Sequence, residues 1–256
     1  MKNIIVGNTG LIGKTICEKI NFQYKFNTSN IKDIKLLKDK KIELMFLSCL
    51  PAQKYLVNKN ILDDIKNIIY IIDLIKDIDV KKIILISTID IYCESNLLSN
   101  EDTIPTIKTL NYGTNRYLFE KLINETFKNS EIKIFRLGGL FGKFIKKNII
   151  YDLLNNNNVD NININSSYQW YDLKDLYYDI NNCIINFKES NIFNLFNEPI
   201  ETSFLINEIF NKKINCKLDK RIEYNFKTKF FSNGYFLNKN DIVCKIKRFI
   251  NEYSNK

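Results

Sequence analysis

Gly7-Asn8-Thr9-Gly10-Leu11-Ile12-Gly13 is the stretch that decides the fold of this chain. It follows the short apolar run Ile4–Val6 and precedes a helical pattern whose apolar residues share one face. A strand, a glycine turn and a helix in this order favour a dinucleotide site, because glycines let backbone N–H groups approach a pyrophosphate closely and the helix start adds partial positive charge. We therefore expect residues 7–13 to bind a cofactor; a tight turn without a ligand is the alternative.

Two further segments carry side chains suited to proton transfer. The first is an apolar run that ends in Ser87-Thr88 and continues through Asp90 to Tyr92. The second places Tyr112 and Arg116 four residues apart, which predicts that both lie on one face of a helix.

In this order, the three segments resemble the extended branch of the short-chain dehydrogenase/reductase superfamily, whose members are mostly sugar-nucleotide epimerases, dehydratases and reductases. The segments Lys133–Gly142, Gln169–Leu176 and Ile192–Leu195 continue the resemblance, which thus covers most of the chain. It implies an α/β fold: a doubly wound, Rossmann-type parallel sheet with a small, trimmed C-terminal substrate lobe. The implied cofactor is NAD or NADP, and the implied substrate is a nucleotide sugar.

The resemblance also implies roles for three residues. Tyr112 is the acid/base, Thr88 binds the reacting oxygen, and Arg116 stands where the family has a lysine that holds the nicotinamide ribose. An ordinary tyrosine is a poor base near neutral pH, so we expect the Arg116 charge to favour the phenolate. Arginine carries the same charge as lysine, but its planar guanidinium is bulkier than an ammonium, so it does not simply substitute for lysine. Two interpretations therefore stay open: an NAD(P)-dependent epimerase or ketoreductase acting on a nucleotide-linked sugar, or a non-catalytic NAD(P)-binding sensor or assembly protein.

Departures from the family pattern refine these expectations. Ile89 stands where 4,6-dehydratases carry an aspartate, which favours an epimerase or a ketoreductase over a dehydratase. Asn27 follows the second expected strand where NAD-specific members carry a carboxylate, so both NAD and NADP remain. Besides the glycine turn, the expected cofactor contacts are Asn27, Ser48 and Arg116. The expected substrate contacts are Asp90, Gly139, Lys146, Asn148, Gln169 and Trp170.

Hydrophobic periodicity predicts alternating strands and helices in the first half of the chain. Such alternation favours a parallel sheet with helices on both faces, and right-handed crossovers bring the strand ends to one edge. We expect residues 1–141 and about 161–200 to form the dinucleotide-binding domain, and about 142–160 and 201–256 the small lobe. The expected strands are 2–6, 24–27, 44–48, 82–87 and 133–137, and the expected helices are 12–20, 31–37, 63–76 and 115–129.

The amino-acid composition and charge pattern argue against nucleic-acid, metal and membrane partners. The net charge is +9, but lysines alternate with aspartates and no basic helix carries aromatic residues at stacking intervals, so we expect no nucleic-acid partner. The chain has no histidine and no C-x-x-C pair, so we expect no metal site. Charges interrupt the longest apolar run, residues 61–80, so we expect no membrane association. We also expect no signal peptide and a cytoplasmic location; a homodimer is left open.

Overall fold

The computed structural model describes residues 2–214 and 221–254. Their contacts divide the chain into two compact units. The first extends to Ser95 and includes Ile104–Arg136 and Tyr177–Phe193. The second comprises Asn96–Thr103, Leu137–Leu176 and the described residues from Asn194 onward.

The first unit is built around one sheet with helices on both faces. Its elements are β1 (Asn3–Val6), α1 (Leu11–Cys17), β2 (Tyr24–Phe26), the 3-10 helix η1 (Ile31–Leu37), β3 (Ile42–Leu47), α2 (Lys54–Lys59), α3 (Ile61–Ile75), β4 (Val80–Thr88), the 3-10 turn η2 (Ile89–Tyr92), α4 (Tyr112–Thr126), β5 (Glu131–Leu137), α6 (Leu176–Asn186) and β9 (Ile192–Leu195).

The six strands lie in the order β2-β1-β3-β4-β5-β9. β1 pairs in parallel with both β2 and β3, and β3 pairs in parallel with β4. The chain thus leaves β1 toward one side and returns across it to the other, so the strand order reverses between β1 and β3. Open parallel sheets bind ligands at such a reversal, outside the carboxyl ends of the strands. The expected doubly wound parallel sheet is confirmed.

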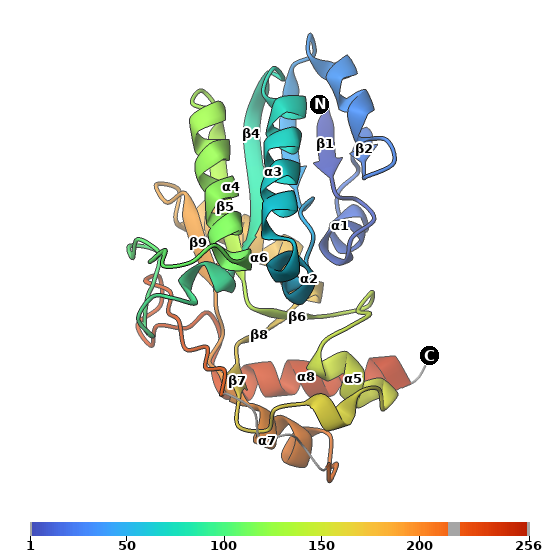
Figure 1. Cartoon of the computed structure of the whole chain (residues 1–256), viewed down its shortest axis with the longest axis vertical. Helices are drawn as coiled ribbons and strands as arrows, with labels where there is room; N and C mark the ends of the chain where they lie inside the picture. The colour runs from blue at the N-terminus through green and yellow to red at the C-terminus, as the bar shows by residue number, and fades with distance from the viewer. Residues whose placement is uncertain (1, 215–220, 255–256) are drawn as a thin grey trace. The chain divides into compact units, whose positions relative to one another are not determined.

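Alternate residues of the inner strands face opposite sides of the sheet, as the two-residue period of a strand requires. In β3, Met45 and Leu47 join a core with α3 and α4, whereas Phe46 meets the ring of Phe22 edge-on at 6.2 Å between centroids. Figure 1 shows α3 and α4 running across the same face of the sheet. Side chains of α1 and α6 line a pocket together with Phe46 and Ile84, which places these two helices on the other face.

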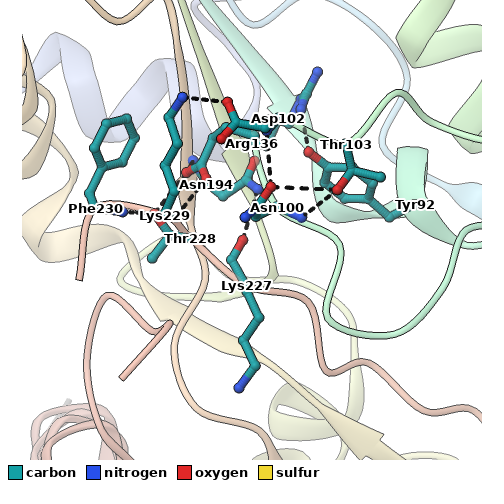
Figure 2. Close-up of polar contacts among 11 residues, drawn as sticks. Tyr92, Asn100, Asp102, Thr103, Arg136, Asn194, Lys227, Thr228, Lys229 and Phe230 are labelled. Carbon is teal, nitrogen blue, oxygen red and sulfur yellow. Dashed lines mark hydrogen bonds and ion pairs between the residues drawn. The ribbon is translucent and has the colours of Figure 1, made fainter. Parts of the chain in front are cut away.

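A buried ion pair joins β5 to α4. Arg136 donates from Nε to Oε1 of Glu120 at 3.1 Å and from Nη2 to Oε2 at 2.6 Å. The Ser87 hydroxyl, at the end of β4, donates to the same carboxylate at 2.5 Å. Arg136 also donates to the Tyr92 hydroxyl at 2.5 Å (Figure 2). Arg136 and Glu120 are only 1% and 2% exposed. Two charges can be buried this deeply because each neutralises the other and both make further hydrogen bonds.

The second unit has two small sheets: β6 pairs in parallel with β8, and β7 pairs antiparallel with β10. Its apolar core includes Phe141, Trp170 and Phe249. Its elements are β6 (Gly139–Phe141), α5 (Ile149–Asn155), η3 (Val159–Asn161), β7 (Ser167–Tyr168), β8 (Trp170–Asp172), η4 (Leu173–Asp175), β10 (Ile200–Glu201), α7 (Thr202–Phe204), the π-helical turn η5 (Leu205–Ile209) and α8 (Lys239–Ser254).

This division differs from the one expected from the sequence, which assigned residues 96–103, 137–141, 161–176 and 194–200 to the first domain. The difference has a physical cause, because β8 pairs with β6 and Trp170 joins the core of the second unit. Among the described residues, no helix is both long and apolar enough to cross a membrane.

Residues 96–103 bond to the rest of the second unit through the backbone of Leu98 and Ser99 and through the side chain of Glu101. Its carboxylate accepts hydrogen bonds from the backbone N–H groups of Asn194 (2.8 Å) and Lys229 (2.9 Å) and from the Thr228 hydroxyl (2.7 Å). Burial raises the pKa of Glu101, and these hydrogen bonds oppose the rise. Figure 2 also draws the Asp102–Lys229 ion pair (2.5 Å) and the bond from the Asn194 side chain to the Lys227 carbonyl (2.9 Å).

The buried pair gives the first prediction. Glu120→Gln leaves the Arg136 guanidinium buried without a balancing charge, and breaking a buried pair in this way costs about 3–5 kcal/mol. We therefore expect a large fall in the free energy of unfolding measured by urea denaturation. Glu125→Gln is the matched control, because Glu125 lies on the same helix in a largely exposed pair with Lys128. The control should change stability by less than about 0.5 kcal/mol; equal losses in both variants would contradict the prediction.

Candidate functional site

The glycine turn joins β1 to α1 where the strand order reverses. Gly7 has a φ of +99°, and a Cβ atom there would lie 2.3 Å from the Ser48 carbonyl oxygen. A Cβ atom on Gly13 would lie 2.0 Å from the Gly7 carbonyl oxygen. Backbone contacts alone therefore require glycine at both positions. A Cβ atom on Gly10 would approach the Gly7 oxygen only to 3.4 Å, so the turn is open above Gly10.

Polar side chains from the neighbouring strand ends lie near this turn. Asn27, after β2, donates to Oδ1 of Asn8 at 3.5 Å and accepts bonds from the N–H and hydroxyl of Ser29. The Ser48 hydroxyl, after β3, is buried and has no hydrogen-bond partner among the described residues. A buried hydroxyl without a partner is costly, so Ser48 is available to a ligand at this edge. The remaining expected cofactor residues are Thr9, which is exposed, and Leu11 and Ile12, which are half-buried at the start of α1.

At the end of β4, Thr88 and Asp90 are joined by two hydrogen bonds. The Thr88 hydroxyl accepts from the Asp90 N–H and donates to Asp90 Oδ2, both at 3.2 Å. The other carboxylate oxygen, Oδ1, lies 2.5 Å from the Lys54 ammonium and accepts from the Cys93 thiol at 3.2 Å. Burial disfavours the charged form of Lys54, but Asp90 and Cys93 together outweigh burial, so the pKa of Lys54 is raised.

Tyr112 begins α4 beside this turn. Asn111 caps the helix by accepting from the Thr114 N–H at 3.1 Å. Contact with the turn is very close, because a Cβ atom on Gly113 would lie 2.0 Å from the Asp90 carbonyl oxygen. Tyr112 is 8% exposed, and the Arg116 guanidinium lies 4.4 Å from its ring centroid. The four-residue spacing thus puts Tyr112 and Arg116 on the same helix face, as the sequence predicts.

Arg116 is bound to a partner that the sequence analysis did not identify. Its guanidinium donates to both carboxylate oxygens of Asp64, at 2.7 and 3.2 Å, and to the Pro51 carbonyl oxygen at 2.7 Å. Asn115 donates to the same carboxylate at 2.8 Å. The side chains of Arg116 and Asp64 are 6% and 3% exposed. The positive charge expected to act on Tyr112 is therefore balanced by an adjacent negative charge.

Burial dominates the titration of Tyr112. It raises the pKa of the phenol, and Arg116 opposes this rise only in part. Arg116 acts on the phenol in the direction expected from the sequence, because it favours the phenolate, but desolvation of the ring outweighs it and the pKa of Tyr112 is raised.

The other expected substrate contacts lie in the second unit. Gln169 is 1% exposed, and its amide bonds to the Asn197 and Phe226 carbonyls and to the Phe226 N–H at 2.7–2.8 Å. Trp170 is 3% exposed, and its indole nitrogen is buried with no partner among the described residues. A Cβ atom on Gly139 would lie 2.9 Å from the Trp170 ring. Gln169 and Gly139 thus have structural roles within this unit.

Asn148 and Lys146 differ from each other in environment. Asn148 caps α5 by accepting from the Tyr151 N–H at 3.1 Å, and its amide donates to the Leu140 carbonyl at 2.7 Å. Lys146 is exposed. Both remain predicted substrate contacts.

Two residues central to the first unit's site were missed at the sequence level, Asp64 and Lys54. Asp64 had a detectable signal, because it shares a helical stripe with Ile68, Ile71 and Ile75, all of which are buried. An acidic residue on the apolar face of a helix needs a buried partner. Lys54 had no comparable signal, since its short helix carries one buried residue. No group of three or more potential metal ligands is found among the described residues.

The comparisons with known proteins bear on the fold. No protein-family model matches the chain, and no curated protein is detectably similar in sequence. Solved structures are similar in fold. An NAD-dependent NDP-hexosamine 5,6-dehydratase of tunicamycin biosynthesis matches with a TM-score of 0.76 at 14% identity, over 100% of this chain and 98% of its own. A UDP-glucose 4-epimerase from Thermotoga maritima matches with a TM-score of 0.74 at 14% identity, over 100% and 99%.

A third similar structure is a UDP-glucuronic acid 4-epimerase from Bacillus cereus, solved with a fluorinated UDP-sugar and NAD. Its TM-score is 0.71 at 16% identity, over 98% of both chains. The chain has the fold of these enzymes. The fold predicted from the glycine turn, the Ser87-Thr88 segment and the tyrosine helix is confirmed.

The glycine contacts give the second prediction. Gly13→Ala places a methyl group against the Gly7 carbonyl, and overpacking of this kind costs about 1–3 kcal/mol. Gly10→Ala is the matched control in the same turn, where a methyl group finds room. Thermal and urea unfolding should show a loss of stability for Gly13→Ala and a much smaller change for Gly10→Ala. The reverse order of the two variants would show that the turn is packed differently.

Proposed function

We propose that this protein is an NAD(P)-dependent enzyme of the extended short-chain dehydrogenase/reductase superfamily that acts on a nucleotide-linked sugar, as an epimerase or a ketoreductase. The observation that carries the proposal is the packing of Tyr112 against the turn that holds Thr88, in the same unit as an open glycine turn at the strand reversal. The activities of the similar enzymes support the same general chemistry.

The residues at the strand reversal fit a dinucleotide. The open surface above Gly10 gives room for a pyrophosphate beside the start of α1, and the unpartnered Ser48 hydroxyl can bond a ligand at the neighbouring strand end. Asn27 presents no carboxylate to repel a 2′-phosphate, so both NAD and NADP fit the second strand end. When bound, the nicotinamide supplies a hydride donor or acceptor.

Tyr112 would transfer the proton, and Thr88 would position the reacting oxygen. Because burial keeps the phenol protonated, Tyr112 suits the donation of a proton to the oxygen of a bound ketone. The Thr88 hydroxyl lies at the end of β4 and would position the same oxygen. In the opposite direction, the phenol must first lose its proton before it acts as a base. An epimerase needs both directions, and a ketoreductase needs only the first.

A non-catalytic NAD(P)-binding role is the second candidate. One observation favours it: Arg116, which stands in the place of the family's lysine, is engaged by Asp64 and the Pro51 carbonyl. The two candidates differ in whether a nucleotide sugar is turned over, and the two predictions below separate cofactor binding from catalysis.

The third prediction concerns the cofactor. Gly10→Val places a branched side chain over the open turn, so NAD and NADP should lose measurable binding while the protein stays folded. Calorimetric titration of both proteins with both cofactors is the measurement, with circular dichroism as the check on folding. Unchanged affinity in folded Gly10→Val would remove the glycine turn from the cofactor site.

The fourth prediction concerns Tyr112. Tyr112→Phe should lower turnover by roughly 10²–10⁴-fold, the usual contribution of a general acid or base. Turnover is measured on UDP-, GDP- and dTDP-linked sugars by following cofactor absorbance and product. Tyr117→Phe, on the same helix and partly exposed, is the control and should keep wild-type turnover.

The same variant tests the protonation state. In protein labelled with carbon-13 at the tyrosine ring, the resonance lost in Tyr112→Phe should titrate above the ordinary value of about 10 when no ligand is bound, because burial raises the pKa. Tyr112→Phe with wild-type turnover would overturn the mechanism, and tight cofactor binding without turnover of any sugar would favour the non-catalytic role.

A further inference from the structure

The short helix α2 is tied to the candidate site by two side chains. Lys54 reaches the Asp90 carboxylate at 2.5 Å, and Asn58 accepts a hydrogen bond from the Tyr112 N–H at 2.8 Å. Residues four positions apart share one face of a helix, so α2 presents both groups to the site at once. One bond holds the turn after β4, and the other holds the start of α4.

Arg116 anchors the residues immediately before α2. Its guanidinium donates to the Pro51 carbonyl while both Asp64 oxygens balance its charge. A cation held in this way has little left to offer a ligand, because two of its nitrogens already bond to protein oxygens and its side chain is 6% exposed. Its effect is to fix the segment that presents Lys54.

Lys54 is connected to the Thr88 hydroxyl through Asp90. The Asp90 carboxylate is held by the ammonium on Oδ1 and receives the Thr88 hydroxyl on Oδ2. The Thr88 hydroxyl donates to the Asp90 carboxylate and accepts from the Asp90 N–H, so its remaining lone pair can accept a hydrogen bond from a sugar hydroxyl, whereas a ketone oxygen is held only when the proton turns toward it. Lys54 is 44% exposed in its side chain and remains protonated, since Asp90 raises its pKa.

We propose that Lys54 is a positioning residue of this site: it holds the Asp90 carboxylate, which in turn sets the orientation of the Thr88 hydroxyl. The inference rests on the proposed function, because it assigns Lys54 a role in the reaction of Tyr112 and Thr88. In this arrangement the cation that contacts Asp90 is Lys54 of α2, and Arg116 of α4 holds the segment before α2 in place.

Three variants test the inference. Lys54→Met removes the ammonium, Lys54→Arg keeps a cation that can reach Asp90, and Lys59→Met is the matched control at the exposed end of the same helix. Misplacement of a reacting group by about 1 Å costs on the order of 10²-fold in rate. We expect Lys54→Met to lower kcat by about that factor with NAD(P) affinity unchanged, Lys54→Arg to recover most of the loss, and Lys59→Met to match wild type.

A second readout needs neither substrate nor cofactor. The Asp90 N–H bonds to the Thr88 hydroxyl, so its amide hydrogen exchange should accelerate in Lys54→Met and stay slow in Lys54→Arg and Lys59→Met. Asp90→Asn weakens the same link from the other side, and it should lower kcat without adding to the effect of Lys54→Met.

The outcomes separate this inference from the proposed function. Wild-type kcat and slow Asp90 exchange in Lys54→Met, or a Lys54→Arg protein no better than Lys54→Met, would overturn the role of Lys54 even if Tyr112→Phe is slow. If Tyr112→Phe itself turns over normally, the proposed function fails. Accelerated Asp90 exchange would then still establish the structural link from Lys54 to Thr88, but the role in a reaction would be overturned.

Discussion

The pairing of Arg136 with Glu120 is the interaction on which the rest of the first unit depends. It joins β5 to α4 and, through Ser87 and Tyr92, to the end of β4 and the turn that follows. The strand that carries Thr88 and the helix that carries Tyr112 are therefore fixed to one fully enclosed carboxylate. The buried ion pair thus sets the position of these two elements relative to each other.

The sequence predicted the fold and the order of the motifs because both depend on local patterns. The turn from Gly7 to Gly13 marks a β-α junction, and apolar runs of about four to six residues locate the strands to within about two residues at each end. The spacing of Tyr112 and Arg116 correctly places both on one helix face. Each inference used residues adjacent in the sequence or within one helical turn.

The sequence could not predict what those side chains contact, since the decisive partners lie far along the chain. Asp64 is 52 residues from Arg116, and Lys54 is 36 residues from Asp90. Burial was a further unknown, because a motif does not show whether desolvation or a nearby cation dominates the titration of Tyr112. The segment around Trp170 was placed in the wrong unit for a related reason: a three-residue strand gives no signal of which strand it pairs with.

The contact between Gly113 and the Asp90 carbonyl has a consequence for the evolution of such sites. Because backbone meets backbone there, any side chain at residue 113 would force the tyrosine helix away from the hydroxyl-bearing turn. Any chain that keeps this packing must therefore keep glycine at this position, however far its other residues diverge.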